Sequence, residues 1–135
     1  MQESIMGLHL FALDADLAAL EAELEKAGDA ARADTLVELS WHLRQRDCAR
    51  ALALAARAEA AMPAGANPAA TARLQLVRGE IKALFADIEG ARILLQGALG
   101  VFLELGDYVG AGDAEWLLSS AWNESGDRQA RDREL

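Results

Sequence analysis

The residues that could carry chemistry are few in this chain of 135 residues, and they lie far apart. His9 and His42 belong to different expected helices, and neither has a cysteine or a second histidine at metal-ligand spacing. Cys48, the only cysteine, stands between Asp47 and Arg50, where it is either a reactive thiolate or a buried, inert thiol. The sequence contains no glycine-rich phosphate loop, no HExxH helix and no nucleophile elbow. We therefore expect no catalytic site, no metal and no cofactor.

The side chains best suited to a partner follow one face of three expected helices. Positions spaced by three and four residues from Thr35 onward, and their equivalents forty and eighty residues later, are mostly polar. We hypothesise that Arg78 and Lys82 meet a carboxylate of a partner segment, while Phe85 and Trp122 hold an apolar side chain. Alternatively, the two basic residues are solvated charges and the aromatic residues are core. The candidate binding residues of this strip are Glu38, His42, Arg78, Lys82, Phe85, Glu115 and Trp122.

The elements that position these residues repeat with a period of forty residues. Asp47, Asp87 and Asp127 mark the period, and each stands where an N-cap would satisfy the free backbone N–H groups of a helix. A fixed period of about 20 to 50 residues is typical of stacked repeats, which bury their apolar faces only against neighbours. Three sets of residues align in this register: Leu36, Leu76 and Trp116; Val37, Val77 and Leu117; Trp41, Ile81 and Ala121.

Helical periodicity divides the chain into one leading helix and three helical hairpins. The leading helix (4–28) has leucines at 10, 13, 17, 20 and 24, a stripe that either packs onto the first repeat or forms a dimer seam. Pro63 and Pro68 bound the one expected loop. The expected repeats cover 32–63, 69–106 and 110–135, with helices near 32–45, 47–62, 69–85, 88–105 and 110–124 and a last helix from Asp127.

Small residues predict where helices approach one another closely. Alanines 51, 55, 58, 91 and 98 fall on the inner faces of the expected helices. Gly90, Gly97 and Gly100 lie inside one expected helix, where each costs up to about 1 kcal/mol relative to alanine. Close backbone contact or a locally loosened helix would account for them. The last expected helix is short and polar, so it either caps the array or indicates that the chain is a piece of a longer protein. The second interpretation is favoured, because so short a helix would leave the apolar face around Trp116 incompletely covered.

Composition and charge restrict the classes of protein and partner. The chain is 53% apolar but only 5% aromatic, and strand-type alternation is missing, so we expect an all-α fold. The net charge of −9 is concentrated in acidic residues at both ends, which argues against nucleic acid as a partner. No signal peptide or membrane-spanning stretch is apparent, and a single cysteine favours a reducing compartment. We expect a cytoplasmic, soluble domain without a membrane partner.

Three segments within residues 33–135 resemble tetratricopeptide (TPR) repeats. The stretch RDCARALALAARAEAAMP is similar to the second helix of that family, and GDYVGAGDAEWLL and AEWLLSSAWNESGDRQA are similar to the start of a further unit. The period of forty is longer than the family's unit, and Gly79 stands one place before the family's small residue, beside Glu80.

The resemblance implies an α-solenoid, here of seven helices, that binds peptides or partner proteins on a concave face. Similar bacterial arrays sit beside signalling output domains such as diguanylate or nucleotide cyclases or transcription regulators. We therefore expect a protein-interaction module, the N-terminal sensory part of a larger bacterial signalling protein, with a protein, a peptide or its own output domain as partner. The alternative is a homodimerisation module acting through the leucine stripe or the last hairpin. A ligand pocket in the groove is a third possibility.

Overall fold

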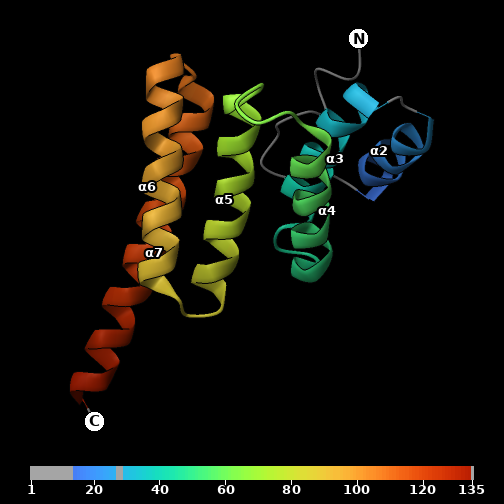
Figure 1. Cartoon of the computed structure of the whole chain (residues 1–135). Helices are drawn as coiled ribbons and strands as arrows, with labels where there is room; N and C mark the ends of the chain where they lie inside the picture. Colours follow the sequence, from blue (N-terminus) through green and yellow to red (C-terminus); the bar gives the residue numbers. More distant parts are fainter. Residues whose placement is uncertain (1–13, 27–28, 135) are drawn as a thin grey trace.

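Helices are the only regular secondary structure in the part of the chain that its computed structural model describes (Figure 1). The backbone is described for residues 14–26 and 29–134, and the side chains for 14–26 and 32–122. No strand occurs in these ranges, so the all-α prediction is confirmed. The described part contains six helices: α2 (Asp14–Lys26), α3 (Asp29–Leu43), α4 (Cys48–Ala61), α5 (Pro68–Leu84), α6 (Ile88–Leu105) and α7 (Tyr108–Glu134).

Four of these helices begin at intervals of twenty residues, each behind a capping side chain. In every case a side-chain oxygen accepts a hydrogen bond from the backbone N–H three residues later, at 2.9 to 3.1 Å. Asp47 and Asp87 are therefore N-caps, as their spacing predicts. Asp127 is not, because it lies inside α7. The four capping residues are Asp47, Asn67, Asp87 and Asp107.

The last helix departs most from the expected layout. A break near residues 125–126 and a third hairpin were predicted, but α7 continues without interruption from Tyr108 to Glu134. The signal for the break was Gly126 followed by Asp127. A single glycine inside a helix costs only about 1 kcal/mol, and no proline stands nearby to remove a backbone donor. With nine more residues than α6, α7 extends past the end of that helix (Figure 1).

Each helix packs against the next one along the chain, and α5 also packs against α3 and α7. The α5–α6 contact is close at Gly79, where a Cβ atom would come within 2.7 Å of Leu95 Cδ2. The α6–α7 contact is close at Gly110, which faces the ring of Phe102. Close contact was expected instead at Gly90, Gly97 and Gly100. The expectation is wrong for Gly100, which has nothing within 4 Å of an added Cβ, and at Gly90 an added Cβ would meet the carboxyl of its own capping residue, Asp87.

The core runs continuously from α2 to α7. The five alanines expected at close contacts are all fully buried. Leu20 and Leu24 are buried as well, and α2 packs against α3, so this part of the leucine stripe is used within the chain. Leu10 and Leu13, like His9 and the expected start of the leading helix near residue 4, lie outside the described residues.

Candidate interaction surfaces

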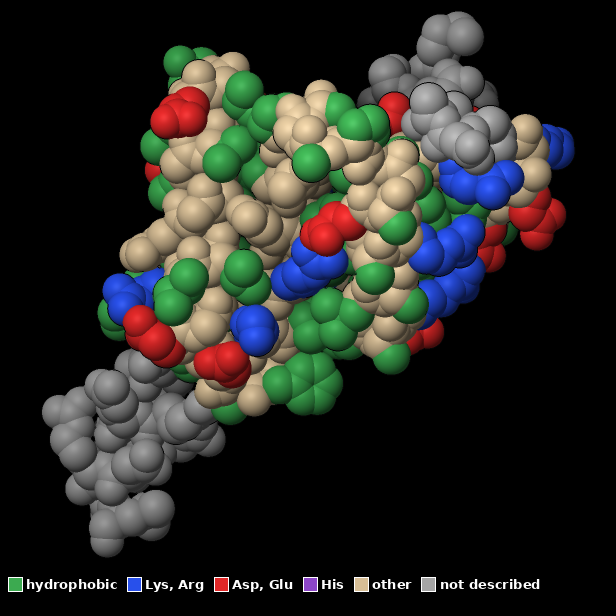
Figure 2. Space-filling view, in the orientation of Figure 1, with side chains coloured by type: hydrophobic (Ala, Val, Ile, Leu, Met, Phe, Trp, Pro, Cys, Tyr) green, Lys and Arg blue, Asp and Glu red, His purple; other side chains and the backbone are tan. Residues whose placement is uncertain are grey.

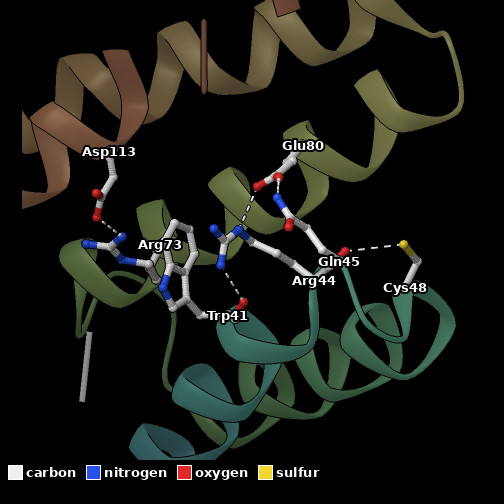
Figure 3. Close-up of polar contacts among 7 residues, drawn as sticks. All are labelled: Trp41, Arg44, Gln45, Cys48, Arg73, Glu80 and Asp113. Carbon is white, nitrogen blue, oxygen red and sulfur yellow. Dashed lines mark hydrogen bonds and ion pairs between the residues drawn. The ribbon is translucent and has the colours of Figure 1, made fainter. Parts of the chain in front are cut away.

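A buried ion pair joins the turn that follows α3 to α5. Arg44 Nε donates to Glu80 Oε1 at 2.6 Å, and the two side chains are only 3% and 8% exposed. Gln45 Nε2 donates to the other carboxylate oxygen of Glu80 at 2.5 Å. Arg44 Nη1 also donates to the carbonyl of Trp41 at 2.9 Å, and the thiol of Cys48 donates to the carbonyl of Arg44 at 3.2 Å (Figure 3). Both oxygens of Glu80 are therefore hydrogen-bonded without water.

A second buried arginine joins α5 to α7. Arg73 Nη1 donates to Asp113 Oδ2 at 2.7 Å, across forty residues of sequence. The indole of Trp41 lies between the two guanidinium groups, with its centroid 3.7 Å from Cζ of Arg44 and 4.6 Å from Cζ of Arg73 (Figure 3). Stacking on an aromatic face and pairing with a carboxylate are the two contacts that suit a buried guanidinium. We call these five residues the polar layer: Trp41, Arg44, Arg73, Glu80 and Asp113.

The polar layer was not among the predicted functional residues. Its sequence signal was present, because Arg73 and Asp113 are separated by one full period, which places them at equivalent positions of α5 and α7. The unusual Glu80 beside Gly79 was noticed only as a departure from the tetratricopeptide pattern. In the fold it is the acceptor for Arg44.

A hollow of about 250 Å³ lies on one side of the polar layer. Glu38 of α3 contributes to its wall, so this candidate residue lies in a hollow rather than on an open strip. Burial raises the pKa of the Glu38 carboxyl, and the neighbouring carboxylates of Glu23 and Asp34 raise it further. The lining residues are Asp34, Val37, Glu38, Asn67, Ala69, Ala70, Arg73, Phe102 and Asp107.

A smaller hollow of about 180 Å³ lies beside Glu80, where α3, α5 and α7 meet. Trp116 and Leu84 form its apolar walls, and Gln45 and Ser120 supply polar groups. Trp116 is nevertheless 52% exposed, so much of the indole faces solvent.

The predicted strip does not form one exposed surface. His42 is buried at 5% exposure, which overturns its assignment to an exposed face. Arg78 is paired with Glu59 of α4, and Lys82 lies 3.4 Å from Asp87. Figure 2 shows basic and acidic side chains next to one another over α5 and α6. The two basic residues expected to meet a partner's carboxylate are thus already paired within the chain.

The remaining members of the strip, Phe85, Glu115 and Trp122, are exposed. Phe85 is 73% exposed at the end of α5. Glu115 and Trp122 lie on α7, on a face with several further exposed side chains that the prediction did not include. We call this the open face, and it consists of Tyr108, Val109, Gly112, Glu115, Trp116, Ser119 and Trp122.

The open face is apolar for a surface. Its four large side chains are Tyr108, Val109, Trp116 and Trp122, which are 79%, 64%, 52% and 56% exposed. Gly112 and Ser119 add little bulk, and Glu115 is the one carboxylate among the residues of this face. Monomeric proteins rarely leave such a contiguous group of large apolar side chains in water unless it serves as a contact surface.

The described residues offer no arrangement suited to metal chemistry. Among residues 14–26 and 32–122, no group of three or more histidine, cysteine, aspartate or glutamate side chains could hold a metal ion. No helix in the described part of the chain is long and apolar enough to span a membrane. Comparison with protein-family models, with curated proteins and with solved structures yields no match for this chain.

Proposed function

We propose that this chain is a protein-interaction module that docks a partner protein on the open face of α7. The exposure of four large apolar side chains on one side of a single helix supports the proposal best. The resemblance to tetratricopeptide repeats, which act as binding modules, points the same way. It also favours a solenoid that serves as the sensory part of a bacterial signalling protein, next to an output domain.

The chemistry of the open face suits protein binding. Burial of apolar surface drives association, and tryptophan and tyrosine dominate the energy of most interfaces. Along α7, Gly112 lies between Tyr108 and Trp116, and Ser119 lies between Trp116 and Trp122, so another backbone can approach at both small residues. A surface with small residues between aromatic flanks favours an inserted helix over a flat loop.

Self-association is the other use of the same face. Leu20 and Leu24 are buried against α3, so these two leucines give no support to a dimer seam on α2. A homodimer through α7 would use the open face twice, about a twofold axis. The experiment therefore measures mass as well as binding.

Two open glycines provide a matched pair of variants. Gly112 on α7 and Gly100 on α6 both have nothing within 4 Å of an added Cβ, and only Gly112 belongs to the open face. Arginine at either site gains about 1 kcal/mol of helix propensity and adds one charge. Gly112→Arg blocks the proposed surface, and Gly100→Arg controls for charge and stability.

Immobilised parent protein, Gly112→Arg and Gly100→Arg are each exposed to lysate of the source organism, and captured proteins are quantified by mass spectrometry. We expect a protein held by the parent and by Gly100→Arg and lost from Gly112→Arg, with the interaction reproduced using the purified partner. Equal capture by all three would refute docking on α7. A mass that doubles with concentration, except in Gly112→Arg, would replace the proposal with self-association.

A further inference from the structure

The face of α5 that packs against α6 corresponds, forty residues later in the sequence, to a face of α7 that is exposed. Gly79 of α5 faces Leu95 of α6, and the side chain of Gln75 faces Gly97 with its Oε1 atom 3.9 Å from the position of an added Cβ. Forty residues later the equivalent positions are Ser119 and Glu115, and both are exposed. The same holds for the aligned large residues, because Leu36 and Leu76 are 1% and 0% exposed and Trp116 is 52% exposed.

Residue sizes change in a complementary way between the two covered pairs. Leu39 of α3 is followed one period later by Gly79 of α5, whereas Ala55 of α4 is followed by Leu95 of α6. All four positions are buried. In α3 and α4 the first helix has the large residue and the second the small one, whereas in α5 and α6 the first has the small residue and the second the large one. Close packing requires such complementary sizes. Because Ser119 is small, a helix that packs on the open face should resemble α6 and place a large residue opposite Ser119.

The charge of the open face adds a second requirement. Gln75, which is neutral, lies opposite Gly97 in the α5–α6 pair. Its counterpart Glu115 is an acid, and it has no basic residue beside it on the open face. A covering helix with lysine or arginine at the position equivalent to Gly97 would pair with Glu115 while the interface excludes water.

We propose that the open face of α7 receives an amphipathic helix of the partner protein, bound in the way that α6 covers α5. This inference rests on the proposed function and names the class of partner. The bound helix carries a leucine over Ser119, an alanine four residues before it and another three residues after it, as Ala91, Leu95 and Ala98 are arranged in α6. Two residues after its leucine it carries a lysine or arginine for Glu115.

Synthetic peptides derived from residues 87–106 test this class directly. The first peptide carries Gly97→Lys, the second Gly97→Glu, and a third combines Gly97→Lys with Leu95→Ala. Binding to the full chain is followed by tryptophan fluorescence and by calorimetry. We expect the first peptide to bind best and the other two to bind about tenfold more weakly, because charge pairing or the central apolar contact is lost.

Variants of the protein establish where the peptide binds. Ser119→Arg should abolish binding of the first peptide, and Gly100→Arg should leave it unchanged. Glu115→Lys should reverse the preference, so that the Gly97→Glu peptide binds best. Binding that survives Ser119→Arg would place the peptide elsewhere, for example in place of the resident α6, and would overturn the inference.

Failure of this inference can be told apart from failure of the proposed function. If no peptide binds but Gly112→Arg still loses a captured partner, docking on α7 holds and the α6-type helix is rejected as its ligand. If the peptides bind only after the chain is diluted below a dimer transition, the occupant is a second copy of the chain, and the inference of a partner's helix is overturned.

Discussion

The two sides of α5 make contacts of opposite character. Toward α6 the contact is apolar and close, with Gly79 against Leu95 and fully buried alanines beside them. Toward α3 and α7 it contains two buried arginines, each paired with a carboxylate. The helix α5 therefore packs against α6 through shape and against its neighbours α3 and α7 through directed polar contacts.

This difference indicates how the position of α5 relative to its neighbouring helices is specified. Apolar contacts are not directional. A helix that shifts along its neighbour, so that one small residue takes the place of another in the contact, therefore loses little hydrophobic free energy. A hydrogen-bonded ion pair is directional, and a shift by one turn would leave a buried charge without its partner. We interpret the polar layer as the feature that sets the register of α3, α5 and α7, while the α5–α6 contact contributes close apolar packing.

Removing one half of a buried pair should have the largest effect. Glu80→Ala leaves Arg44 without its carboxylate in the core, and we expect a loss of about 3–5 kcal/mol in the free energy of unfolding. Arg44→Met combined with Glu80→Leu removes both charges and should cost much less than Glu80→Ala alone. Urea denaturation followed by circular dichroism measures both. A double variant as unstable as the single one would contradict our interpretation of the pair.

Overpacking the apolar side of α5 should have the next largest effect. The Cβ atom of Gly79→Ala would lie 2.7 Å from Leu95 Cδ2, so we expect a loss of about 1–3 kcal/mol. Adding Leu95→Ala should recover part of that loss, because it vacates the contested volume. Gly100→Ala is the control, since it meets nothing within 4 Å and should stabilise α6 by up to about 1 kcal/mol. Thermal unfolding of the four proteins tests the set.

The regular part of the fold could be predicted from the sequence, because its signals are local. Apolar periodicity, the proline-bounded loop and the capping aspartates 47 and 87 predict α4, α5 and α6 to within about one or two residues. The prediction for α7 was wrong, since Gly126 is a weak helix breaker and the helix runs on past it. The true cap of α7 is Asp107, which follows the twenty-residue spacing of Asp47, Asn67 and Asp87.

The candidate site was much less predictable, because it depends on contacts between elements. Helical spacing placed His42 and Glu38 on one exposed face, yet His42 is buried and Glu38 lines a hollow beside Arg73. Neighbouring helices decide which face of a helix is buried. The sequence of one helix alone does not specify which helices those neighbours are. The pairing of Arg78 with Glu59 is of this kind, since it joins helices that are nineteen residues apart in sequence at these positions.

Removal of a helix cap should lower stability less than either core substitution. It also distinguishes the aspartates that cap a helix from Asp127, which shares their spacing but lies inside α7. Asp87→Ala removes the acceptor for the backbone N–H of Gly90, and we expect a loss of about 1 kcal/mol. Asp127→Ala lies within α7 and should change stability by less than about 0.5 kcal/mol. Chemical denaturation of the two variants side by side measures the difference. Equal losses would mean that a helix does begin at Asp127.

The smallest change in stability should come from a substitution of Glu38, a residue of α3 that lines the same hollow as Arg73 of α5. Its carboxyl pKa is raised by burial and by the acids Glu23 and Asp34, so the folded state keeps this proton to a higher pH than the unfolded chain does. Stability therefore falls as the pH rises from the ordinary glutamate pKa through the raised one, and the loss is complete above both.

Glu38→Gln removes the titrating group while nearly preserving its size. We expect the variant to unfold like the parent at a pH below the ordinary glutamate pKa and to be more stable than the parent at neutral pH. Denaturant titrations at several pH values between these limits measure the difference between the two proteins. A variant less stable than the parent at neutral pH would mean that the ionised carboxylate makes a favourable contact, most directly with the guanidinium of Arg73 in the same hollow, and the polar layer would then extend to α3 through Glu38 as well as through Arg44.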